Sequence, residues 1–210
     1  MRSLILFLTC FIQLSFLQCQ QKTVAIDIET PPTFTEADKK YEDVFKSLDG
    51  TWKGNFIIYE DTKRQKAKQV DLKNISKKNL EKSSLKQIGS IEVQQIYTSE
   101  SPYFQKVTIT DFYPDTNQKV VSQGVNKVEN GKMLCIVIKP DDTVIHDGYI
   151  DAKDDHTIIW HREETSPQKI EFFRETVLET TYEIIGWGYY EGDDVKLSPR
   201  LWFYGKYVRQ

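Results

Sequence analysis

Hydrophobic and polar residues alternate along most of the chain from Gly89 to the C-terminus. β-Branched and aromatic residues recur there in runs of seven to eleven residues, and an earlier run of this kind begins at Trp52. Alternation over such lengths is typical of β-strands. We therefore expect strands over 52–59, 90–98, 103–113, 119–128, 132–139, 143–150, 157–163, 169–178, 180–190 and 200–209.

Turn-forming residues separate these runs, as at Glu129-Asn130-Gly131 and Pro140-Asp141-Asp142. Connections this short join neighbouring antiparallel strands and leave no room for crossover helices. An open sheet of so many strands would expose two unpaired edges and one wet apolar face, whereas closure removes both. The sequence therefore predicts an all-β fold: an up-and-down antiparallel meander closed into a barrel of eight to ten strands.

A different periodicity precedes the first strand. Ala37, Tyr41, Phe45 and Leu48 recur at helical spacing, and Gly50 follows them. Glycine commonly terminates a helix. We expect a short amphipathic N-terminal helix that lies across one end of the barrel.

The N-terminus carries an apolar stretch of a different kind, from Leu4 to Leu17. It is too short to span a bilayer, for which about twenty residues are needed, but it suits a secretory signal. We expect a signal peptide over 1–19, a flexible tether over 20–34 that contains Pro31-Pro32, and one domain over 35–210. The protein is then exported, either as a periplasmic or cell-envelope lipoprotein or by ordinary secretion.

Whether Cys19 carries a lipid distinguishes the anchored lipoprotein from the secreted protein. Cys19 directly follows the apolar stretch, as the lipid-modified cysteine of a bacterial lipoprotein signal does, although Gln18 departs from the small residue usual at that place. Lipid attachment at Cys19 would anchor the protein to a membrane. Signal removal also removes Cys10, so Cys135 is expected to remain a free thiol.

Charge excludes one class of partner. The formal net charge is −3 and the isoelectric point is about 5.7. Proteins that bind nucleic acid have a basic surface that neutralises phosphates, so no nucleic-acid partner is expected. The stretch from Glu60 to Ile88 is locally rich in lysine. We interpret it as a solvated loop that contains at most a short strand or helical turn; the alternative is a basic rim for an anionic ligand or lipid head groups.

Motifs at both ends of the predicted barrel resemble those of a known family. Phe45 followed by Asp49-Gly50-Thr51-Trp52 resembles the first signature of the lipocalins and wider calycin barrels. The C-terminal run from Pro199 to Arg209 is similar to the end of the lipocalin-like phycobilin lyases. The resemblance implies a calycin-like barrel whose interior holds one ligand. It also implies structural packing of Arg209 over Trp52.

Aromatic residues of the later strands are the candidates for a ligand-binding lining. On a strand over 181–190, Trp187 and Tyr189 share one face, and Gly186 and Gly188 lie on the other. The glycines indicate close approach of a ligand, a neighbouring ring or a bend. We expect a cavity lined by Trp160, Trp187, Tyr189 and Tyr204, with His161 or Arg174 supplying polar contacts, although the alternation does not tell which face points inward.

Catalytic and metal sites lack comparable support. A hairpin turn at 140–143 would place Cys135 opposite Gly148 and diagonal to His146, about 7 Å away, which is too far for proton transfer. We interpret Cys135 as a small core residue, with Arg162 as a further candidate for a buried cation. The three histidines show no metal-ligand spacing. No catalytic residue, metal or cofactor is predicted.

These observations favour a non-enzymatic exported barrel that binds a small apolar or amphipathic ligand. The first alternative is a lyase or isomerase acting on a tetrapyrrole-like or lipid substrate, which requires a polar cluster inside the barrel. The second is a solid barrel whose outer face binds a partner, which requires a large exposed apolar patch.

Overall fold

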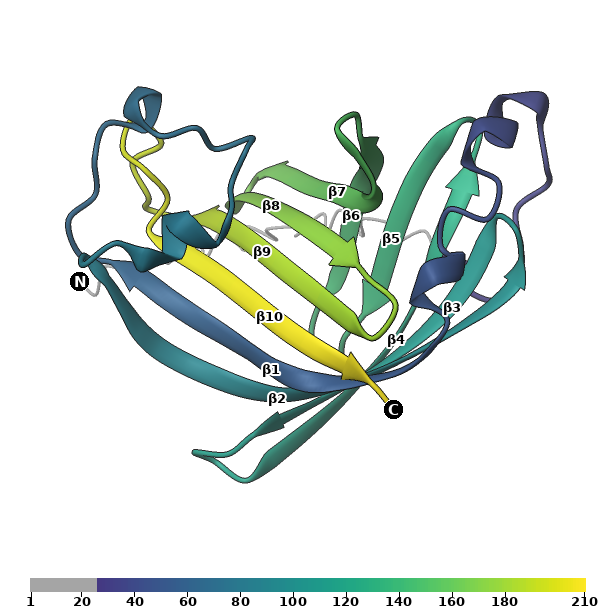
Figure 1. The fold of residues 1–210 in the computed structure, drawn as a ribbon, viewed down its shortest axis with the longest axis horizontal. Coiled ribbons are helices and arrows are strands. Elements are labelled where there is room, and N and C mark those ends of the chain that lie inside the picture. Colours follow the sequence, from purple (N-terminus) through teal and green to yellow (C-terminus); the bar gives the residue numbers. More distant parts are fainter. Residues whose placement is uncertain (1–25) are drawn as a thin grey trace, which may run out of the picture.

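The computed structural model describes residues 26–210, which form a closed antiparallel barrel (Figure 1). The fold class and the strand count predicted from the alternation are confirmed. The ten strands are β1 (Gly50–Asp61), β2 (Leu85–Ser101), β3 (Phe104–Tyr113), β4 (Gln118–Glu129), β5 (Lys132–Ile138), β6 (Thr143–Asp151), β7 (Asp154–Thr165), β8 (Gln168–Val177), β9 (Thr181–Tyr190) and β10 (Leu201–Arg209).

Each strand pairs with the next along the chain, and β1 also pairs with β10 to close the barrel. The closing register sets Trp52 opposite Arg209 and Glu60 opposite Leu201. Because every strand has two neighbours, no edge is left unpaired. The meander is therefore complete, as the even spacing of its turns predicts.

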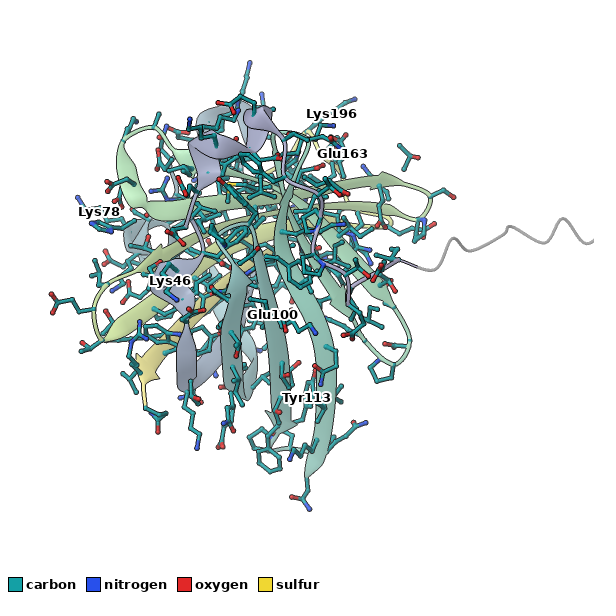
Figure 2. The ribbon with its side chains drawn as sticks, turned by 90° about the vertical axis from the view of Figure 1, so that its right-hand side faces the viewer. Lys46, Lys78, Glu100, Tyr113, Glu163 and Lys196 are labelled. Atoms are coloured by element: carbon teal, nitrogen blue, oxygen red, sulfur yellow. The ribbon has the colours of Figure 1, made fainter. Side chains whose placement is uncertain are left out.

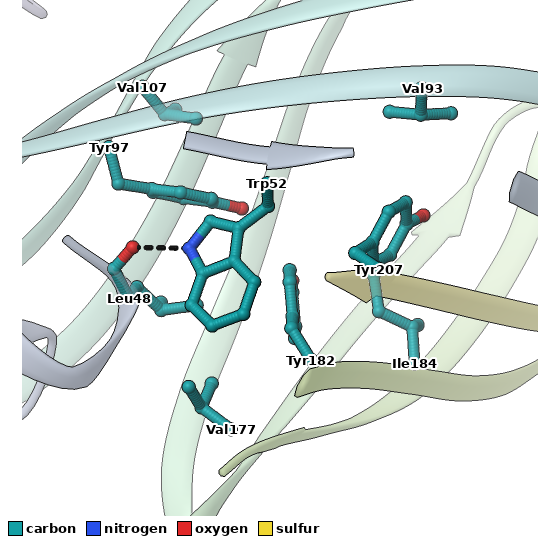
Figure 3. Close-up of a cluster of buried hydrophobic side chains, with 9 residues drawn as sticks. All are labelled: Leu48, Trp52, Val93, Tyr97, Val107, Val177, Tyr182, Ile184 and Tyr207. Carbon is teal, nitrogen blue, oxygen red and sulfur yellow. Dashed lines mark hydrogen bonds between the residues drawn. The ribbon is translucent and has the colours of Figure 1, made fainter. Parts of the chain in front are cut away.

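One end of the barrel is closed by two short 3-10 helices, η1 (Glu36–Tyr41) and η2 (Lys46–Leu48), in place of the single amphipathic helix expected there. Asp38 links η1 to the barrel, because its carboxylate accepts hydrogen bonds from the Thr35 and Gly131 backbone N–H groups. Leu48 and Trp52 are fully buried, and the Trp52 indole donates to the Leu48 carbonyl at 2.7 Å (Figure 3). The helix stop and the first-strand Trp thus form one plug.

The chain between β1 and β2 packs on the outside of the barrel near its other end (Figure 1). It contains η3 (Ala67–Gln69) and η4 (Lys77–Glu81). Its apolar side chains, including the buried Ile75, cover the outer faces of β8–β10. The expected short helical turn is present, but the interpretation as a solvated loop is wrong for the apolar residues, which pack on the sheet. The sequence did not indicate this packing, because these apolar residues are scattered among many lysines.

Backbone hydrogen bonds tie this outer segment to the β9–β10 connection. The Ala67 N–H donates to the Lys196 carbonyl, and the Ser198 N–H donates to the Gln65 carbonyl. Charged side chains such as Lys78 and Lys196 point away from the barrel (Figure 2). The lysines of the segment thus face solvent while its apolar residues face the sheet.

The first described residues also lie against the outside of the barrel. Ile26 and Ile28 pack on a buried cluster of Phe104, Val125 and Ile136 from β3–β5. Part of the predicted tether is therefore docked on the sheet. The expected signal peptide over 1–19 and the expected lipid-attachment residue Cys19 lie outside the described residues. Among residues 26–210, no helix is long and apolar enough to cross a membrane.

Candidate functional site

The barrel encloses a cavity of about 190 Å³ between the plugged end and the opposite end. Most of its wall is apolar, but polar side chains enter it from β2–β6 and β8. A neighbouring hollow of about 200 Å³ shares Phe56, Gln95 and Asp111 with it. The cavity is lined by Phe56, Gln95, Tyr97, Val107, Ile109, Asp111, Ser122, Asn126, Cys135, Val137, Lys139, Val144, His146, Trp160, Phe173, Glu175 and Ile184.

Glu175 is the most deeply placed carboxyl group of the lining. Its strand neighbours are Ile158 and Ile184, and its Oε2 accepts a hydrogen bond from the Trp160 indole at 2.9 Å. Burial raises the pKa of Glu175 to about 7, although the hydrogen bond from Trp160 acts in the opposite direction. Near neutral pH this side chain therefore exchanges between a neutral and a charged form.

Glycines on neighbouring strands make room for the two rings beside Glu175. A β-carbon at Gly148 would collide with the Trp160 ring, and one at Gly186 would collide with Phe173. The close approach expected at Gly186 is thus that of a neighbouring ring from the barrel itself. These two glycines fix where Trp160 and Phe173 lie in the cavity wall.

Cys135 and His146 stand directly opposite each other on β5 and β6. The expected register was wrong by two residues, because the turn joins Ile138 to Thr143 and brings Cys135 level with His146. Burial raises the pKa of the Cys135 thiol far above its usual range, with the nearby Glu175 adding to the effect. The thiol is therefore protonated at neutral pH and is a poor nucleophile.

A second polar cluster closes the inside of the barrel toward the opposite end. Arg162, whose side chain is 5% exposed, lies 2.6 Å from Glu164 and 3.7 Å from Glu171. Glu171 also accepts a hydrogen bond from the Tyr190 hydroxyl at 2.7 Å and lies 3.4 Å from His146 Nε2. Despite burial, these hydrogen bonds and charges keep the pKa of Glu171 below its usual value. Arg162 is thus the buried cation of this barrel, and it has its own carboxylates.

Three buried polar atoms of the described chain make no hydrogen bond of regular geometry: Ser122 Oγ, Tyr182 OH and His146 Nε2, which still lies 3.4 Å from Glu171. Ser122 and His146 line the cavity, and Tyr182 lies near Glu175, whose carboxylate helps to raise the pKa of the Tyr182 phenol. A buried polar group without a partner costs about 1–3 kcal/mol, so such groups usually indicate a missing partner. Two of the three, Ser122 and His146, lie in the wall of one cavity.

At the plugged end, the Arg209 guanidinium carbon lies 4.3 Å from the centre of the Trp52 ring. The guanidinium group also donates to the backbone carbonyls of Ser47, Asp49 and Glu179. Arg209 thereby joins η2, the end of β10 and the β8–β9 turn. This is the packing that the lipocalin resemblance implies.

Of the side chains expected to line the cavity, Trp160 does so. Trp187, Tyr189 and Tyr204 require correction, because they lie on the outer face of β9 and β10. Trp187 donates to the Leu72 carbonyl at 2.8 Å and Tyr189 to the Leu197 carbonyl at 2.7 Å. Trp187 and Tyr189 therefore belong to a second hydrophobic core beneath the outer segment, and Tyr204 lies beside it.

The two polar candidates also lie outside. Arg174 is on the outer face of β8 and pairs with Asp151 at 2.6 Å. His161 is exposed on β7, where it borders an outer hollow of about 410 Å³ together with Trp187 and Phe172. The structure thus brings His161 and Trp187 together, but outside the barrel.

Sequence reasoning missed the polar part of the cavity, namely Gln95, Asp111, Ser122, Asn126, Lys139 and Glu175. A signal for Glu175 was present, because it alternates with Phe173 and Glu171 on one face of β8. Among residues 26–210, no three or more His, Cys, Asp or Glu side chains are grouped so that they could hold a metal ion.

No protein-family model matches the chain, and no curated protein does. One similar solved structure is a redesigned β-barrel, b11L5F_LGL, with 12% identity and a TM-score of 0.37 over 80% of this chain and 96% of that one. Another is EF1p2_mFAP2b bound to DFHBI, with 13% identity and a TM-score of 0.38 over 81% of this chain and 99% of that one. Similarity this distant does not indicate a ligand for this chain.

Proposed function

We propose that this protein is an exported barrel that binds a small amphipathic ligand in its interior cavity. The observation that carries the proposal is the cavity of about 190 Å³, with mostly apolar walls and buried polar atoms that lack partners. Binding pockets combine apolar walls with a few fixed polar groups in this way. An apolar cavity of about 150 Å³ can hold a benzene-sized molecule, so the ligand is small.

The export part of the proposal rests on the sequence of residues 1–19 and on Cys19, which would carry a lipid in a membrane-anchored form. Mass spectrometry of the mature N-terminus tests it. A diacylated Cys19 would support the anchor, and an unmodified N-terminus after cleavage near this position would support secretion. Retention of Met1 to Leu17 in the mature protein would contradict export.

Native mass spectrometry tests ligand binding. Protein purified gently from its own source is expected to carry an extra mass that is released on denaturation. Val107→Phe fills the cavity, because Val107 is a buried lining residue, and should abolish that mass. Ile145→Phe is the matched control, since Ile145 is 40% exposed and lies outside. If both variants carry the same extra mass as the parent protein, binding in the cavity is contradicted.

A second candidate, an isomerase or lyase in the same cavity, is favoured by Glu175. A carboxyl group with a pKa of about 7 inside a pocket is suited to general acid–base catalysis. Cys135 does not add to this candidate, because its thiol stays protonated. Turnover of the molecule identified by native mass spectrometry, and loss of that turnover in Glu175→Gln, would distinguish the enzyme from the binding protein.

A further inference from the structure

Glu175 has no cation beside it, unlike two other carboxylates of the barrel, Glu171 and Asp151. Glu171 has Arg162 and His146, and Asp151 on the outer face has Arg174. Among residues 26–210, no Lys, Arg or His nitrogen lies within 4.0 Å of Glu175. Its hydrogen bond from the neutral Trp160 indole supplies no positive charge. The charged form of Glu175 is therefore incompletely compensated.

The ionisable groups around Glu175 do not supply the charge either. Tyr97 and Tyr207 are buried phenols with pKa values raised above their usual range, and both are neutral at pH 7. The remaining titratable side chains that face it or share its cavity are Cys135, Tyr182, His146, Asp111 and Lys139. His146 lies beside Glu171, and Lys139 is exposed at the opposite end. A cation that reaches Glu175 must then come from a ligand.

The space next to Glu175 suits such a cation. The cavity that Glu175 lines also has Trp160, Phe173 and Tyr97 in its wall. Aromatic faces attract ammonium groups, most strongly where water is excluded. The hydroxyl of Tyr182 lies near the same carboxylate, although Tyr182 is not part of the cavity wall. A carboxylate surrounded by rings is the chemistry that recognises organic ammonium ions.

The rest of the cavity limits the ligand to a small apolar skeleton. Val107, Ile109 and Val137 line it, and its volume of about 190 Å³ exceeds by little the space that a benzene-sized molecule needs. Lys139 lines the cavity near Asp111, so the carboxylate without a nearby cation is Glu175, and like charges in a buried site would repel a carboxylate ligand beside it. The charge balance of the lining therefore favours a cation over an anion.

We propose that Glu175 and the rings of Trp160, Phe173 and Tyr97 form a binding site for a small organic amine in its protonated state, with its apolar part against Val107 and Ile109. This inference rests on the proposed function, because it names the chemical class of the ligand of the same cavity. Glu175 accepts the ammonium hydrogen bonds, and the rings surround the charge.

Isothermal titration calorimetry with three molecules of similar shape tests the amine site: 2-phenylethylamine, 2-phenylethanol and phenylacetate. At about pH 8, the amine is expected to bind at least about tenfold more tightly than the alcohol, and phenylacetate more weakly than both. Because Glu175 must be charged, affinity for the amine should fall about tenfold from about pH 8 to about pH 6. The amine itself stays protonated over this range.

Glu175→Gln removes the charge while keeping an amide oxygen that can accept from Trp160. It should reduce amine affinity to that of the alcohol and abolish the pH dependence. Glu183→Gln is the matched control, because Glu183 lies on the outer face of β9 and pairs with Lys77. It should bind the amine like the parent protein. Melting temperatures of both variants, with and without amine, show whether each remains folded.

Each other outcome overturns the inference. If the alcohol or phenylacetate binds as tightly as the amine, the amine site is wrong while a ligand-binding cavity stands. If amine binding survives in Glu175→Gln, the cation lies elsewhere. If none of the three molecules binds, or the amine fails to raise the melting temperature of the parent protein, the amine site is again rejected. The native mass spectrometry of the Val107 and Ile145 variants then decides separately on the cavity.

Discussion

Both faces of β9 carry large hydrophobic side chains, yet they serve different parts of the molecule. On the inner face, Tyr182 and Ile184 belong to the hydrophobic cluster around Trp52, and Ile184 also borders the cavity. On the outer face, Trp187 and Tyr189 lie in a dry cluster beneath the outer segment of residues 62–84. The comparison shows that the most aromatic face of a barrel strand is not always the face that meets a ligand.

The reason lies in what covers each face. Outside, Ile75 and its neighbours pack over Trp187, although a hollow of about 410 Å³ remains beside its ring, and the indole hydrogen bond goes to the Leu72 backbone. Inside, the barrel wall curves around a space that its side chains do not fill, and polar atoms there remain without partners. The polar atoms of the outer Trp187 and Tyr189 are thus partnered by the chain itself, whereas those of the cavity are partnered in our proposal by a ligand.

Trp187→Ala should give the largest effect that separates the two faces. The ring is 8% exposed and stacks on Phe172 with centroids 5.5 Å apart, so its removal leaves a cavity in the outer cluster. We expect a loss of about 3–5 kcal/mol in unfolding free energy, measured by urea denaturation. Trp187→Phe should lose less. A loss below about 1 kcal/mol for Trp187→Ala would show that the outer segment does not form a core with the barrel.

Glu175→Gln should change stability on the inner face in a pH-dependent way. Because the folded state raises the pKa of Glu175 from 4.5 to about 7, the neutral form is favoured by folding. The parent protein should therefore lose stability as pH rises from about 4.5 to about 7, by up to about 3 kcal/mol, and no further above that range. The Gln variant should lack this loss and be more stable than the parent at about pH 8.

Urea denaturation of both proteins from about pH 4.5 to about pH 8 measures this difference. Glu183→Gln on the outer face is the control and should follow the parent protein. A parent protein whose stability stays level across the range would mean that Glu175 is not desolvated in the barrel.

Arg209→Ala should destabilise the plugged end, where inner face and solvent meet. The variant loses the contact with Trp52 and three hydrogen bonds to backbone carbonyls. Since Arg209 is exposed, we expect a loss of about 2 kcal/mol, seen as a lower melting temperature. Arg209→Lys keeps the positive charge but lacks the planar guanidinium group that donates to several carbonyls. Its melting temperature should lie between those of the parent protein and Arg209→Ala. An unchanged melting temperature in Arg209→Ala would contradict the structural role.

Lys77→Ala should have the smallest effect, less than about 1 kcal/mol in unfolding free energy. Lys77 joins η4 of the outer segment to Glu183 of β9 at 2.7 Å, but its side chain is 54% exposed. Water and salt weaken such a pair. If urea denaturation shows a loss as large as that of Trp187→Ala, the outer segment is held by charge and not by its apolar contacts.

Much of the fold could be predicted because strands and short turns are each indicated by residues that are close together in the sequence. The start of β1 after Gly50, the β4–β5 turn at Asn130-Gly131 and the end of β10 all lie near their expected places. The single N-terminal helix was less accurate, since the chain forms two 3-10 turns instead. The spacing of apolar residues indicates which side chains face the barrel, but it does not distinguish one α-helix from two short 3-10 helices.

The candidate site was harder to predict, because it depends on contacts between distant strands. A hairpin register that differs by two residues was enough to misplace Cys135 relative to His146. Glu175 stood in the sequence as an ordinary strand glutamate. Its isolation from cations follows only from where Arg162 and Arg174 find their own partners.

The sequence alone determined which side chains share a face, since alternate residues of any strand point to the same side. Alternation groups Trp187 with Tyr189, and Tyr182 with Ile184. Only the tertiary structure decided which group points inward. Both groups are hydrophobic, because a segment far away in the sequence packs on the outer face while the barrel encloses the inner one. Two buried faces look alike in a sequence, so only closure of the barrel tells them apart.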